Sequence, residues 1–123
     1  MYHQGVNVLS SLNDNQSIDS EKNLNLEERA LEFINQGKLK EAENIYRGLI
    51  NKGTNSHFVF SNLAIILGMK GKTKEIIRLL ERSIEIEPNY PQAYNNLGVV
   101  LQKESQLDFA IDLFEKAIKL QPD

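Results

Sequence analysis

The sequence lacks cysteine and tryptophan, and it has only two histidines and three prolines among its 123 residues. Without cysteine, the chain can form no disulfide, no thiolate nucleophile and no cysteine-based zinc site. It also lacks an excess of basic residues, because the net charge is −3, and this argues against nucleic acid as a partner. No signal peptide and no apolar run of membrane-spanning length is present. We therefore expect a cytoplasmic protein that binds neither nucleic acid nor membranes.

The residue patterns of catalysis are missing as well. There is no glycine-rich phosphate loop, and the two histidines, His3 and His57, have no metal-ligand spacing. Carboxylate pairs such as Glu27 and Glu28 fall on helix surfaces, where nothing would bury them and tune a general acid. The sequence predicts no enzyme activity, no cofactor and no metal site.

Two amphipathic helix patterns fill residues 88–123. Asn89 and Pro91 are typical of a helix start, since an Asn side chain caps free N–H groups and a first-turn proline loses no helical hydrogen bond. Apolar or small residues then recur at spacings of 3, 4 and 7: Tyr94, Leu97, Gly98 and Leu101. After a break at residues 104–106 the rhythm returns in Ala110, Leu113, Phe114, Ala117 and Ile118, and Pro122 ends it. Neither helix can bury its apolar face alone.

This unit occurs again at a shift of 34 residues. Phe60 and Leu63 take the places of Tyr94 and Leu97, and Pro88 takes the place of Pro122. A second shift gives a more degenerate copy that starts with Leu26, Arg29, Ala30 and Phe33. The period, the order of aromatic and small residues and the closing proline resemble the tetratricopeptide repeat, over about Asn23 to Asp123.

The resemblance implies an all-α fold, a right-handed α-solenoid of three helix-turn-helix pairs. The repeats are expected at residues 23–56, 57–90 and 91–123, after a mobile polar tail at residues 1–22 that has no helical period. Expected helices run over about 24–36, 39–51, 56–70, 74–86 and 107–120, and a further helix opens at Asn89 and Pro91 and precedes the break at 104–106. Gly37 is expected in the first turn and Asn55 or Ser56 as a cap. The charged residues of 74–86 and 107–120 are expected to form a solvated outer surface with weak pairing.

A second stripe, uncharged except for Lys103 at its end, marks the first helix of each later pair. At about 100° per residue, it lies opposite the core-facing residues of the same helix. Its members are Phe58, Asn62, Ile65 and Met69, followed by Gln92, Asn96, Val99 and Lys103. Because equivalent faces align in stacked repeats, these eight residues predict a peptide-binding groove that is neutral and partly apolar. The resulting prediction is a non-catalytic scaffold that binds a protein or peptide.

Two subgroups of the family suggest different ligands. The run from Ala93 to Gly98 resembles repeats that accompany protein O-linked sugar transferases, where stacked Asn side chains bind the backbone of an extended peptide. That resemblance implies that Asn62 and Asn96 are peptide ligands; in the alternative, they only bond neighbouring helices. A second subgroup grips a carboxylate with Lys, Arg and Asn. Its pattern is not matched, because Glu27, Leu31, Gln92 and Asn96 stand at those positions, so acidic chaperone tails are not expected to bind.

The last helix pattern is unusually apolar for the end of a repeat array, which normally finishes with a polar helix. Three interpretations follow: further repeats, a fused domain, or a second molecule that covers the helix. The second would make the chain a targeting or assembly segment of a longer, transferase-type protein. The third predicts a homo-oligomer with a self-association surface at Phe109, Leu113, Phe114 and Ile118.

Overall fold

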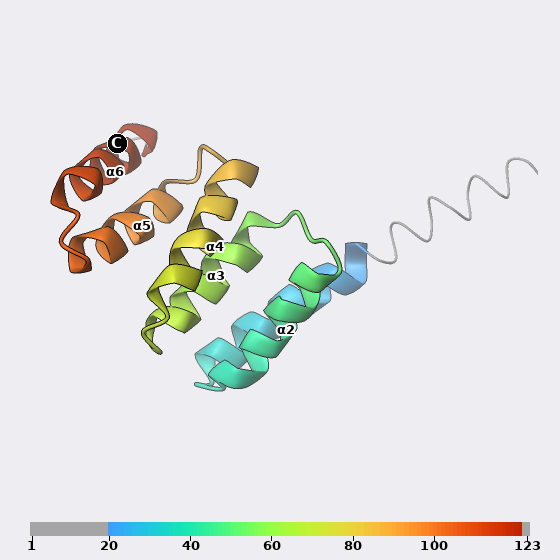
Figure 1. Ribbon diagram of the computed structural model, residues 1–123. Coiled ribbons are helices and arrows are strands. Elements are labelled where there is room, and N and C mark those ends of the chain that lie inside the picture. Colours follow the sequence, from blue (N-terminus) through green and yellow to red (C-terminus); the bar gives the residue numbers. More distant parts are fainter. Residues whose placement is uncertain (1–19, 122–123) are drawn as a thin grey trace, which may run out of the picture. The chain divides into compact units, whose positions relative to one another are not determined.

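A computed structural model describes residues 20–121, and this part of the chain consists of six α-helices without strands (Figure 1). The predicted tail therefore lies outside the described residues up to residue 19. The helical-repeat fold predicted from the sequence is confirmed. Within residues 20–121, no helix combines the length and the apolar composition that a membrane crossing requires. The chain divides into two compact units, Met1–Ile45 and Tyr46–Asp123.

The first unit contains a helix at residues 20–35 and the start of α2 (Leu39–Asn51). The first helix includes residues 20–23, earlier than the expected start at 24, because Glu21 and Lys22 favour helix even without apolar neighbours. Gly37 turns the chain with a φ of 76°. The amide of Gly37 donates to the carbonyl of Ile34, and that of Lys38 donates to Phe33, at 3.0 and 2.8 Å. This is the bonding pattern of a Schellman turn.

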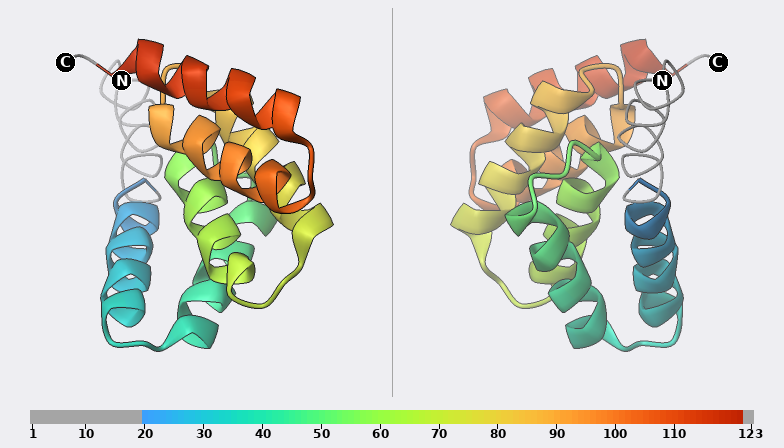
Figure 2. Two further views of the ribbon diagram at one scale, coloured as in Figure 1. Left: turned by 90° about the vertical axis from the view of Figure 1, so that its left-hand side faces the viewer. Right: turned by 90° about the vertical axis from the view of Figure 1, so that its right-hand side faces the viewer.

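The second unit continues with α3 (His57–Gly68), α4 (Thr73–Ile86), α5 (Pro91–Lys103) and α6 (Leu107–Leu120). The bounds of α2 and α6 are those expected, whereas α3 ends two residues early. Consecutive helices pack together: α3 on α4, α4 on α5 and α5 on α6 (Figures 1 and 2). Two antiparallel hairpins, α3–α4 and α5–α6, thus follow each other in this unit.

The core of the second unit is built from the residues that recur at the repeat period. Leu63, Leu67 and Leu80 are at most 1% exposed. Ser83 is also fully buried, and its hydroxyl donates a 3.0 Å hydrogen bond to the carbonyl of His57, which ties α4 to the first residue of α3. A buried hydroxyl with a partner avoids the desolvation penalty of an unpaired one. These contacts hold α3 and α4 together.

The expected helix caps are not found. The residue before α5 is Tyr90, and no side chain caps the helix; the backbone N–H of Asn89 instead donates to the Glu87 carboxylate at 3.0 Å. Ser56 precedes α3, but its side chain makes no capping bond. Both helices begin without a side-chain cap, and in α5 the proline at position 91 presets φ for the first turn and has no N–H to satisfy.

The turn within each helix pair has a left-handed residue at the same place in the repeat. Gly37, Gly71 and Ser105 have φ values of 76°, 74° and 61°. Glycine adopts this conformation without a steric penalty, whereas serine does not. The third repeat therefore forms its turn with a less suitable residue, although the hydrogen bond from the Gln106 N–H to the Leu101 carbonyl is 2.8 Å long, as in the first repeat.

Candidate functional site

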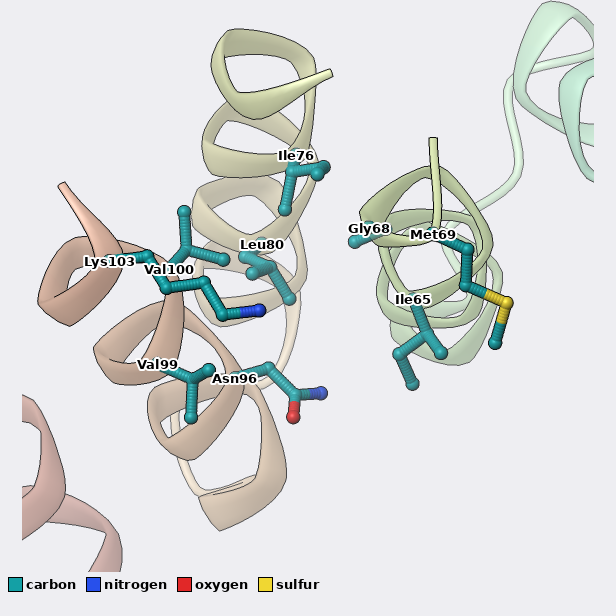
Figure 3. A pocket seen from close by; sticks show the side chains of 10 residues that line it. Ile65, Gly68, Met69, Ile76, Leu80, Asn96, Val99, Val100 and Lys103 are labelled. Carbon is teal, nitrogen blue, oxygen red and sulfur yellow. The ribbon is translucent and has the colours of Figure 1, made fainter. Parts of the chain in front are cut away.

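A cavity of about 300 Å³ opens between α3, α4 and α5 (Figure 3). Helix α4 forms its floor, α3 one wall and α5 the other. The lining residues are Ala64, Ile65, Gly68, Met69, Ile76, Leu80, Asn96, Val99, Val100 and Lys103. The lining is mainly apolar with few polar groups, which is typical of sites that hold a side chain of a ligand.

Small residues on α3 leave this cavity open. Gly68 has no side chain, and no atom lies within 4 Å of the place where its Cβ would be. Behind it, Ile76 and Leu80 are 5% and 1% exposed and make the floor apolar. Ile65 and Met69 stand at the rim, with 48% and 68% of their surfaces exposed. Exposed apolar side chains around an open apolar floor are typical of a binding surface.

Two polar side chains of α5 reach into the same space. Figure 3 shows the Asn96 amide and the Lys103 ammonium extending from α5 toward α3. Within residues 20–121, neither side chain has a hydrogen bond or an ion pair. The amide can both donate and accept, whereas the ammonium only donates. A ligand over the apolar floor could therefore bond to the Asn96 amide, which donates and accepts, and to the Lys103 ammonium, which only donates.

A smaller hollow of about 250 Å³ adjoins the cavity. It shares Gly68, Ile76, Val100 and Lys103 with the cavity and adds Gly71, Thr73 and Glu104. Lys103 thus borders both hollows, whereas Glu104 lines only the smaller one. The cation faces an uncharged lining in the larger cavity, so an acidic or carbonyl group of a ligand is favoured there.

Five of the eight residues predicted for the groove line the cavity: Ile65, Met69, Asn96, Val99 and Lys103. Asn62 does not; its amide donates to the Tyr46 hydroxyl at 3.2 Å, as in the alternative that these amides bond neighbouring helices. Gln92 accepts a 3.0 Å hydrogen bond from the Tyr90 hydroxyl. Phe58 is 48% exposed, and its ring packs on His57 and Tyr90, with centroids 4.0 and 5.5 Å away.

Sequence reasoning missed the residues that form the floor and the opening of the cavity. Ile76 and Leu80 match core positions of the repeat and nothing in their pattern shows that one side of them faces a cavity. Val100 and Ala64 were missed for the same reason. Gly68 carries one available signal, because a glycine has no side chain and so lets another chain approach the helix closely.

One ion pair of α4 joins it to another helix and not to a residue three or four positions away. The Arg47 guanidinium donates two hydrogen bonds to the Glu75 carboxylate, at 3.0 and 3.1 Å. The two residues are 28 positions apart, so they join α2 to α4. This hydrogen bonding, helped by the charge of Arg47 and opposed by desolvation, lowers the pKa of Glu75 below its usual 4.5. One pair on this outer surface is therefore a specific connection between helices.

The predicted self-association surface is divided between two sides of α6. Phe109 and Ile118 are 63% and 68% exposed. At about 100° per residue they point in opposite directions. Leu113 and Phe114 are half-buried, and Phe114 lies against α5, where a Cβ on Gly98 would come within 2.7 Å of its ring. Ile111 and Leu107, which are 53% and 56% exposed, lie on the side of Ile118.

Comparison with known proteins supports the repeat type. Residues 91–123 match the family model described as Tetratricopeptide repeat. No curated protein matches the chain.

Solved structures share the fold. One is the second TPR of Spaghetti (RPAP3) bound to the HSP90 peptide SRMEEVD, with 19% identity and a TM-score of 0.79 over 87% of this chain and 99% of that one. The first TPR of Spaghetti (RPAP3), bound to the same peptide, has 22% identity and a TM-score of 0.77 over 85% and 82% of the two chains. MamA has 23% identity and a TM-score of 0.76; the match covers 89% of this chain but 64% of MamA. The chain therefore has the helical-repeat fold of tetratricopeptide repeat domains.

Proposed function

We propose that the chain is a peptide-binding scaffold and that its binding site is the cavity between α3, α4 and α5. The observation that carries this proposal is the combination of an open apolar floor with the partner-free polar groups of Asn96 and Lys103. Two structures of the same fold, both from Spaghetti (RPAP3), hold a peptide, which supports peptide as the ligand class.

The bound segment places one bulky apolar side chain over Ile76 and Leu80. A cavity of about 300 Å³ has room for a leucine or phenylalanine side chain. Burying such a side chain contributes about 1.5–3 kcal/mol. Most of the affinity then depends on this anchor, as in other interfaces where a few buried side chains dominate.

Asn96 and Lys103 fix the backbone of the segment beside that anchor. The Asn96 amide can donate to a peptide carbonyl and accept from a peptide N–H, so it binds backbone without regard to side-chain type. Lys103 donates to a second carbonyl or to one carboxylate. Asn62 contributes indirectly, because its bond to the Tyr46 hydroxyl holds α3 against α2.

The test is selection from a random peptide library displayed on phage, followed by titration of the enriched peptides in fluorescence anisotropy. Asn96→Ala and Val99→Asp should each weaken binding by about fivefold or more, because one removes a backbone contact and the other charges an apolar wall. Gln102→Ala is the matched control on α5, since Gln102 is exposed and does not line the cavity.

Circular dichroism of each variant keeps the test specific, because an unfolded variant would also lose binding. Asn62→Ala is expected to lower stability through the lost Tyr46 bond, so it does not replace Asn96→Ala. The proposal fails if no peptide is enriched, or if folded Asn96→Ala and Val99→Asp both bind the enriched peptides as tightly as Gln102→Ala.

A further inference from the structure

Helix α6 carries an apolar stripe that repeats a covered stripe of α4. Shifting Ile77, Leu80 and Ile84 by 34 residues gives Ile111, Phe114 and Ile118. On α4, which packs on α5, Leu80 is 1% exposed and the two isoleucines are half-buried. On α6, Ile111 and Ile118 are 53% and 68% exposed. The residues that share this face, named here the α6 stripe, are Leu107, Ile111, Phe114 and Ile118.

Head-to-tail stacking of two copies does not suit this stripe. It would require the helix at residues 20–35 of one copy to cover α6 of another as α5 covers α4. In α5, the buried Leu97 and the half-buried Val100 occupy positions that correspond, two repeat periods earlier, to Arg29 and Glu32. Both are charged and exposed. Placing them on an apolar stripe would desolvate charges without partners, which is costly.

The charges of α6 instead favour a second α6 that runs in the opposite direction. Asp108 and Asp112 lie in its first half, and Lys116 and Lys119 in its second. None of these side chains has an ion pair within the part of the chain that the structure describes. At about 100° per residue, Asp108 and Lys119 lie along the same edge of the α6 stripe. An antiparallel neighbour brings opposite charges together along that edge.

We infer that two copies of the chain pair through the α6 stripe, with their α6 helices antiparallel about a two-fold axis near Ile111 and Phe114. Figure 2 shows that α6 lies along α5. Ile111 and Ile118 of α6 are exposed, whereas Ala110 and Ala117 of the same helix are buried. The axis places Leu107 against Ile118 of the second copy. It also places Asp108 against Lys119 of the second copy, twice by symmetry. Such an isologous contact closes on itself and stops at a dimer.

One residue acts against this pairing. Glu115 lies near the same edge of the stripe as Asp108, close to the axis, where the second copy offers no cation. Its carboxylate therefore faces the acidic part of the other helix. Removing that charge should strengthen the dimer. We therefore expect Glu115→Gln to associate more tightly than the wild type.

The experiment is sedimentation equilibrium of the full chain from low to high micromolar concentration. The wild type should show a monomer–dimer equilibrium, and Ile118→Asp should remain monomeric throughout. Phe109→Asp is the matched control, because Phe109 is as exposed as Ile118 but points to the opposite side of α6. Circular dichroism checks that both variants fold, as substitutions at exposed positions should.

Charge reversal tests the orientation. Lys119→Asp should weaken the dimer by about threefold to tenfold, because it replaces two attractive pairs with repulsive ones. Adding Asp108→Lys to the same chain should restore the affinity.

A wild type that stays monomeric at the highest concentration would overturn the inference. So would a dimer that Phe109→Asp disrupts and Ile118→Asp does not. A double reversal that fails to recover, with Glu115→Gln also without effect, would overturn the antiparallel arrangement. None of these readouts uses a peptide, so they are independent of the cavity between α3 and α5.

Discussion

The Arg47 guanidinium grips the Glu75 carboxylate with two parallel hydrogen bonds of 3.0 and 3.1 Å. Bidentate geometry of this kind is stronger and more directional than a single contact between flexible surface charges. The two side chains are 38% and 31% exposed, so solvent still screens the pair. The pair links α2 to α4 and therefore contributes to the junction between successive repeats.

Stability should depend on the ionisation of Glu75. Its pKa in the folded chain is below the usual 4.5, mainly because of the hydrogen bonds from Arg47. A lowered folded pKa means that the stabilisation is fully present above the unfolded pKa and is lost as the pH falls through the folded value. Glu75→Gln should cost about 0.5–1 kcal/mol at pH 7. Urea unfolding at pH 7 and at successively lower pH checks this.

The difference between wild type and Glu75→Gln should shrink as the solution is acidified below pH 4.5. Glu85→Gln is a suitable control, because Glu85 pairs with Arg82 on an exposed surface within one helix. That pair should contribute little at any pH. A constant difference down to the lowest pH would show that packing, and not ionisation, makes Glu75 important.

Replacing Ser105 with glycine should stabilise the turn between α5 and α6. Ser105 has a φ of 61°, where Gly37 and Gly71 occupy the equivalent positions. A left-handed residue with a Cβ costs about 1–2 kcal/mol, and the greater freedom of glycine in the unfolded chain offsets part of the gain. Ser105→Gly should therefore raise the free energy of unfolding by about 0.5–1 kcal/mol.

The reverse substitution provides the control for this prediction. Gly71→Ser introduces a side chain at a φ of 74° and should destabilise by a similar amount. Urea midpoints of the two variants and the wild type give both values. If Ser105→Gly lowers stability, the Ser105 side chain contributes something that the backbone conformation alone does not indicate.

The repeat period allowed the fold to be predicted from the sequence. The cavity below the predicted groove could not be predicted in this way. Apolar spacing fixes which face of a helix is buried, and so α2 and α6 begin and end where the pattern indicates. Periodicity does not distinguish a residue buried on all sides from one that forms a cavity floor. Ile76 and Leu80 have the spacing of core residues, and that spacing does not show that they also line the cavity.

Side-chain partners were the second limit of sequence reasoning. Asn62 and Asn96 are equivalent in the repeat, so the repeat period alone gives them the same role. The difference arises because Tyr46, an aromatic of the preceding repeat, presents its hydroxyl to Asn62 at 3.2 Å. The corresponding residue for Asn96, 34 positions after Tyr46, is Leu80, which has no polar atom. The Asn96 amide is thereby left available to a ligand.

The acidic peptide SRMEEVD, which both Spaghetti (RPAP3) domains hold, should bind weakly here. Lys103 is the one cation that lines the described cavity, and Glu104 borders the adjoining hollow. Several carboxylates therefore compete for a single partner. In fluorescence anisotropy, a variant peptide with Gln for both Glu residues and Asn for Asp should bind within about fivefold of SRMEEVD, a difference of about 1 kcal/mol. A strong preference for the acidic peptide would show cationic contacts beyond Lys103.

Gly98 should be intolerant of even a methyl group. A Cβ there would lie 2.7 Å from Cε1 of Phe114 and 3.0 Å from two other ring atoms, so the ring must move away from α5. Alanine gains up to about 1 kcal/mol of helix propensity, but forced repacking costs about 1–3 kcal/mol, and we expect Gly98→Ala to destabilise overall.

Gly48→Ala in α2 is the matched control, because nothing lies within 4 Å of its new methyl group, and it should stabilise by up to about 1 kcal/mol. Adding Phe114→Leu to Gly98→Ala should recover part of the loss in urea unfolding, since the shorter side chain vacates the space that the methyl group needs. If Gly98→Ala is as stabilising as Gly48→Ala, the close approach of α5 and α6 does not depend on the missing side chain.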